Sequence, residues 1–103
     1  MPNPPSNLTV QVVTTGTGKK LKATANLAWV DNATNEDSYI VLRFKRTGRK
    51  NQQTCSFELE ITLPANTTRY ADSTVSTSTC RYAVAARNSA RQSGFVQADV
   101  TVP

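Results

Sequence analysis

Apolar and polar residues alternate with a period of two along most of this chain. The first stretch places Leu8, Val10 and Val12 on one side of the polar residues Thr9 and Gln11. This spacing puts every second side chain on the same face of a β-strand. No window repeats apolar residues at the spacing of three and four that an amphipathic helix needs. The chain is therefore predicted to be all-β.

Seven such stretches follow one another, separated by turn residues. They cover residues 8–12, 21–29, 39–44, 57–63, a short strand ending at 70, 80–86 and 96–102. Seven short strands within about 100 residues predict a seven-stranded, immunoglobulin-like Greek-key sandwich of two antiparallel sheets. An up-and-down barrel is the weaker alternative, because the chain has few tight Asn-Gly or Asp-Gly turns. In this scheme residues 1–6 form a proline-rich linker and residues 7–103 form one domain.

The 103 residues include no histidine. This excludes Ser-His and Cys-His nucleophiles and histidine-bound metals. Glu58 and Glu60 are the remaining acid-base pair, and they fall on the polar face of the fourth stretch, opposite Phe57. We interpret them as a solvated face, and the acidic loop at 31–37 as side chains that cap backbone turns rather than a cation site. We therefore expect no enzymatic activity, no cofactor and no metal. No apolar stretch approaches the about 20 residues of a membrane span, so no membrane is expected as a partner.

Twelve Lys and Arg outnumber seven Asp and Glu, which gives a net charge of +5. The positive charge gathers on the third strand and its turn, with a further arginine on the sixth strand. The candidate anion-binding residues are Arg43, Arg46, Arg49 and Arg81. The aromatic residues that would stack on bases, Trp29, Tyr39 and Tyr82, fall on inward positions. Nucleic acid is therefore not expected as a partner.

The third strand is apolar on both faces. If Tyr39 and Val41 face the core, then Ile40, Leu42 and Phe44 face outward. These three residues form a candidate interaction patch, which suggests docking of a neighbouring domain or partner. The alternative is that stems of nearby arginines cover them, and the sequence leaves both open.

Four motifs in order resemble the fibronectin type III family, in the form found in bacterial secreted or surface proteins. The motifs are Leu27-Ala28-Trp29, the run from Trp29 to Arg43 with Asp31, Asn32, Glu36, Tyr39 and Val41, the run from Leu63 to Asp72, and Tyr82-Ala83-Val84-Ala85-Ala86-Arg87-Asn88. The resemblance extends over roughly residues 4–103. Two positions depart from it. Cys80 stands where the family has a tyrosine that ties the corner between the fifth and sixth strands, and Arg91 stands where a loop glycine is usual.

In a sandwich of this order, Cys55 and Cys80 lie at the same end of the molecule. A disulfide between them is geometrically possible, although the strand that should lie between them must bend. It would contribute about 3 kcal/mol and replace the anchoring lost with the corner tyrosine. Two reduced, buried thiols are the alternative. We favour the disulfide, which implies an oxidising compartment.

The resemblance implies a non-catalytic accessory module of a larger secreted or cell-surface protein, often a polysaccharide-degrading enzyme or an adhesin. We expect it to be a monomer when isolated and to serve as a spacer and an interdomain or protein-protein interaction unit. Its expected partners are neighbouring domains of the parent chain and a protein or polysaccharide. The alternative is a binding module for a polysaccharide or an anionic surface through the basic hairpin. Both hypotheses place the chain outside the cell or at its surface.

Overall fold

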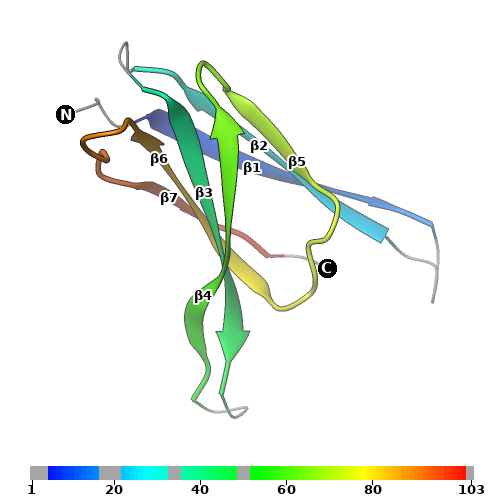
Figure 1. The fold of residues 1–103 in the computed structure, drawn as a ribbon. Helices are drawn as coiled ribbons and strands as arrows, with labels where there is room; N and C mark the ends of the chain where they lie inside the picture. The colour runs from blue at the N-terminus through cyan, green and yellow to red at the C-terminus, as the bar shows by residue number, and fades with distance from the viewer. Residues whose placement is uncertain (1–4, 17–21, 33–35, 49–51, 102–103) are drawn as a thin grey trace.

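The computed structural model describes residues 5–16, 22–32, 36–48 and 52–101, and these form seven strands (Figure 1). The strands are β1 (Ser6–Thr15), β2 (Lys22–Val30), β3 (Ser38–Thr47), β4 (Thr54–Pro64), β5 (Arg69–Asp72), β6 (Thr79–Arg87) and β7 (Val96–Asp99). Each overlaps one of the seven alternating stretches of the sequence, although β5 continues past residue 70 to Asp72 and β7 ends at Asp99. Within the described ranges, no helix is long and apolar enough to cross a membrane.

The strands form two antiparallel sheets that pack face to face (Figure 1). One sheet has the order β1-β2-β5 and the other has the order β4-β3-β6-β7. The prediction of an all-β sandwich of two antiparallel sheets is thus confirmed. The fourth strand pairs with the third rather than with the fifth, which distinguishes the order from that of a constant-type immunoglobulin domain.

The core lies between the two sheets and is built from the inward residues of the alternating pattern. Its buried members are Ala25, Leu27, Trp29, Tyr39, Val41, Tyr82, Val84, Ala86 and Val100. The rings of Trp29 and Tyr39 are tilted against each other with 5.8 Å between their centroids. The aromatic residues expected on inward positions are therefore in the core.

Two β-bulges interrupt the alternation next to β3. Arg43 pairs with Leu59 and Phe44 pairs with Phe57, so Glu58 is an extra residue in β4. A bulge of one residue moves the following side chains to the opposite face. The sequence placed Phe57 on the same face as Leu59 and Glu58 on the same face as Glu60, and this was wrong. Phe57 lies on the outer face beside Phe44 with 59% of its surface exposed, and Glu58 contacts Arg43.

The second bulge lies in β6. Phe44 pairs with Arg81 and Lys45 pairs with Thr79, which leaves Cys80 as the extra residue. Both ladders of β3 therefore shift register at Phe44. Bulges bend strands and change the direction of side chains. The two bulges beside Phe44 therefore allow β4 and β6 to approach each other across β3.

Candidate functional site

A buried polar cluster joins the two sheets at one end of the core. Arg43 on β3 is only 7% exposed, and Asp72 at the end of β5 is 1% exposed. Arg43 Nη1 donates to Asp72 Oδ2 at 2.8 Å, and Arg43 Nε donates to Glu58 Oε1 at 2.8 Å. The Tyr82 hydroxyl on β6 donates to the same Asp72 oxygen at 2.5 Å. The backbone N–H and the hydroxyl of Thr74 donate to Asp72 Oδ1 at 3.0 and 2.8 Å. Every hydrogen-bonding position of the buried carboxylate is thus used.

These contacts set the charge states of the cluster. Burial raises the pKa of the Asp72 carboxyl, but hydrogen bonds from Tyr82, Arg43 and Thr74 outweigh burial and hold that pKa below its ordinary value. Burial and the hydrogen bond to Asp72 raise the pKa of the Tyr82 hydroxyl far above its ordinary value. Burial lowers the pKa of Arg43, and its bonds to Asp72 and Glu58 raise it by more. Asp72 and Arg43 are therefore charged and Tyr82 is neutral at pH 7.

A disulfide lies next to this cluster. The Sγ atoms of Cys55 on β4 and Cys80 on β6 are 1.99 Å apart, and their Cα atoms are 6.1 Å apart. Strands separated by one intervening strand normally lie about 9.5 Å apart, so β3 has to bend between them. The bulge at Cys80 accounts for the close approach, because it lets this cysteine turn toward β4. The bond from Tyr82 to Asp72 thus joins β6 to β5, and the disulfide joins the start of β6 to β4.

The loop after β6 adopts its turn without a glycine at position 91. The side-chain oxygen of Asn88 accepts from the backbone N–H groups of Ala90 and Arg91 at 2.9 and 2.7 Å. The described non-glycine residues with positive φ are Asn7 and Asn66, so Arg91 has an ordinary backbone conformation. The Asn88 side chain supplies the turn, which explains how an arginine replaces the expected glycine.

The four arginines expected to bind an anion do not form one surface. Arg43 is buried and paired, as described above, because it continues the inward face of Tyr39 and Val41. Arg81 is on the outer face, where it pairs with Asp99 at 2.8 Å and lies over the Phe44 ring. Arg46 donates to the carbonyl of Thr77 at 2.6 Å. Arg49 lies outside the described residues. The expected cluster is therefore wrong for Arg43, which is not accessible to an anion.

The three residues of the expected apolar patch also differ from one another. Ile40 is fully buried, whereas Leu42 and Phe44 are half-buried on the outer face of the four-stranded sheet. Glu60 on β4 and Arg87 on β6 form an ion pair of 3.5 Å that bridges β3 where Ile40 lies. Of the two alternatives that the sequence left open, cover by a nearby arginine fits Ile40, and exposure does not. Sequence reasoning missed Phe57, which the bulge in β4 brings beside Phe44 with their ring centroids 6.2 Å apart.

The acidic residues of the first long loop make structural contacts. Tyr39 donates its hydroxyl hydrogen bond to Asp31, and Asp37 accepts from the backbone N–H of Ser89 at 2.9 Å. Glu36 accepts from the backbone N–H of Asn66 at 3.2 Å. Over the described part of the chain, no three His, Cys, Asp or Glu side chains are placed to hold a metal ion. Glu58 and Glu60 are separated by the bulge and pair with different arginines.

Comparison with known proteins identifies the architecture. No protein-family model matches the chain, and no curated protein matches it. Among solved structures, the chain is similar to a β-sandwich protein that was redesigned by computer, with 21% sequence identity and a TM-score of 0.66. The match covers 98% of this chain and 90% of the redesigned protein. The chain is therefore a β-sandwich over nearly its whole length.

Proposed function

We propose that this chain is a fibronectin type III-like domain that serves as a non-catalytic accessory module of a larger secreted or cell-surface protein. In this proposal the module acts as a spacer and contacts a neighbouring domain of the same polypeptide. The four sequence motifs support the family, and the two-sheet fold agrees with them. The disulfide between Cys55 and Cys80 supports an oxidising location.

Two cross-links favour a stiff spacer. The Arg43–Asp72 pair connects β3 of one sheet to β5 of the other, and the disulfide connects β4 to β6. A spacer transmits position only if its two sheets do not slide past each other. The Arg43–Asp72 pair opposes such sliding, because it joins strands of different sheets. The disulfide stiffens the four-stranded sheet itself, because it joins two of its strands that are not hydrogen-bonded neighbours.

The observation that carries the proposed contact is the outer aromatic patch, which we define as Leu42, Phe44 and Phe57. Phe57 is 59% exposed on β4, an edge strand, although it packs against Phe44. Arg81 lies 6.0 Å from the Phe44 ring centre and provides a polar rim. An exposed aromatic pair with a charged rim is the composition of a small protein interface. A neighbouring domain is the occupant that we propose, because a tethered partner needs only a small surface.

Hydrogen exchange in the longer polypeptide tests this proposal. We expect amides of β4 around Phe57 to exchange more slowly in that polypeptide than in the isolated chain. Phe57→Ser should remove the added protection, because it deletes the most exposed ring of the patch. Val13→Ser is the matched control, since Val13 is 41% exposed on the other sheet. Equal exchange in the isolated chain and the longer polypeptide would contradict the proposal.

A further inference from the structure

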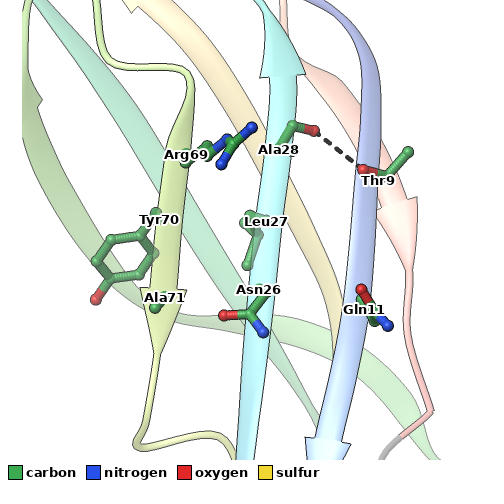
Figure 2. Close-up of a pocket in the computed structure, with 8 residues that line it drawn as sticks. All are labelled: Thr9, Gln11, Asn26, Leu27, Ala28, Arg69, Tyr70 and Ala71. Carbon is green, nitrogen blue, oxygen red and sulfur yellow. Dashed lines mark hydrogen bonds between the residues drawn. The ribbon is translucent and has the colours of Figure 1, made fainter.

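An open hollow of about 440 Å³ lies on the outer face of the three-stranded sheet (Figure 2). Two rows of side chains cross the three strands there. One row is Thr9, Ala28 and Arg69, and the other is Gln11, Asn26 and Ala71. The small side chains of Ala28 and Ala71 leave space between the longer ones. The hollow extends about 10 Å across three strands and about 7 Å along them.

Among the described residues that line this hollow, Arg69 is the only charged one. Its side chain extends from β5 toward Ala28 on β2 (Figure 2). The described part of the chain gives it no hydrogen bond and no ion pair. All seven Asp and Glu side chains are bonded elsewhere. Their partners are Tyr39 for Asp31, Asn66 for Glu36, Ser89 for Asp37, Arg43 for Glu58, Arg87 for Glu60, Arg43 for Asp72 and Arg81 for Asp99.

The other charges on the outer face of the three-stranded sheet also leave Arg69 without a carboxylate partner. By the alternation of β1, β2 and β5, the outward positions include Arg69 and Lys22, and none of the outward described positions is Asp or Glu. The outer face of the other sheet differs, because its Arg81 and Arg87 are paired with Asp99 and Glu60. A free guanidinium on a face without carboxylates attracts an anion. Its planar fork suits the two oxygens of a carboxylate.

The other polar groups favour a sugar over a peptide. The side-chain amides of Gln11 and Asn26 also have no hydrogen bond to the described residues. Their amides both donate and accept, as hydroxyl groups do. A peptide that adds a strand needs the edge of a sheet, whereas this hollow lies across the face of three paired strands. Its two alanines also leave no deep apolar pocket for a peptide side chain.

From these observations we infer that the outer face of the β1-β2-β5 sheet binds an acidic oligosaccharide, with Arg69 holding a uronate carboxylate and Asn26 and Gln11 bonding neighbouring hydroxyls. This site is on the opposite sheet from the outer aromatic patch. It is also distinct from the basic hairpin around Arg43. It therefore goes beyond the proposed spacer function, and either can fail without the other.

The test is an NMR titration of the isotope-labelled chain with trigalacturonate. We expect shifts at the amides of the six residues of the two rows, and no comparable shifts on β4. Arg69→Gln should weaken binding at least tenfold, because it removes a charge-assisted hydrogen bond. Asn26→Ala should weaken it a few-fold. Arg91→Gln is the matched control, since Arg91 is exposed in a loop away from the hollow and the same charge is removed; it should change the affinity less than twofold.

Two further probes decide what the site recognises. The methyl ester of trigalacturonate keeps the sugar but loses the charge, and it should bind at least tenfold more weakly. Triglutamate keeps the carboxylates but lacks the hydroxyls, and it should also bind more weakly than trigalacturonate. Equal binding of the ester would overturn the role of the carboxylate, and equal binding of triglutamate would overturn the choice of a sugar. Equal losses in Arg69→Gln and Arg91→Gln would show attraction by net charge alone and would also overturn the site.

Discussion

Arg43 and Arg69 are two arginines on strands of one small sandwich, and they have opposite surroundings. Arg43 faces inward from β3, is 7% exposed, and bonds to Asp72, Glu58 and Thr74. Arg69 faces outward from β5 and is exposed, and its side chain bonds to none of the described residues. The comparison teaches that a count of basic residues says little about binding. Which face of its sheet an arginine occupies decides whether its charge is used by the fold or offered to a ligand.

Loss of the carboxylate beside Arg43 should have the largest effect on stability. Asp72→Ala leaves a buried guanidinium and a buried hydroxyl without their shared acceptor. We expect the free energy of unfolding to fall by about 3–5 kcal/mol in urea denaturation. Asp99→Ala is the control, because Asp99 pairs with Arg81 in an exposed position and should cost less than about 1 kcal/mol. A similar small loss in both variants would mean that the cluster does not hold the sheets together.

Removal of the disulfide should have the next largest effect. The bond closes a loop between residues 25 positions apart, and the double variant Cys55→Ala with Cys80→Ala should lose about 3 kcal/mol. Because the disulfide lies in the four-stranded sheet, binding of trigalacturonate to the other sheet should not change. Intact mass after alkylation under denaturing, non-reducing conditions checks the bond itself. Two alkylated thiols in the unreduced chain would show that it does not form.

Acid should lower the stability of the chain by protonating Asp72, the partner of Arg43, with an effect smaller than that of the two preceding variants. The pKa of Asp72 is lower in the folded chain than in the unfolded chain. The stability that this carboxylate contributes is therefore present above the unfolded pKa, about 3.9, and is lost as the pH falls through the folded value. Urea denaturation from about pH 5 down to about pH 2 should show the decline. Asp72→Asn should show a shallower decline, and an unchanged one would exclude Asp72 as its source.

The alternation of the sequence predicts the strands well, because each buried face leaves a period of two in the residues. The same alternation also indicates that the side chain of Arg43 faces the core. This residue continues the inward series of Tyr39 and Val41, so it belongs to the core face, yet its charge suggested a surface position. The partner that makes its burial possible, Asp72, comes from the other sheet and is 29 residues away. Alternation within one strand cannot reveal such a contact.

The bulges and the hollow were beyond the reach of the sequence for a different reason. The alternation of Phe57, Leu59 and Ile61 continues through the bulge at Glu58, so nothing in β4 marks the change of face. Alternation along β5 indicates that Arg69 faces outward, because the neighbouring Tyr70 faces inward. Whether it has a partner depends on the register between β2 and β5, which places Ala28 beside it. Register across strands is set by the assembled sheets.

The most direct test of the contrast is the same substitution at both arginines, followed by urea denaturation at pH 7. Arg43→Gln and Arg69→Gln remove the same charge from the same chain. Arg43→Gln should lower the free energy of unfolding by about 3 kcal/mol or more, because it leaves Asp72 buried without its cation. Arg69→Gln should change it by less than about 0.5 kcal/mol. Equal losses in the two variants would contradict the division between an arginine used by the fold and an arginine free to bind.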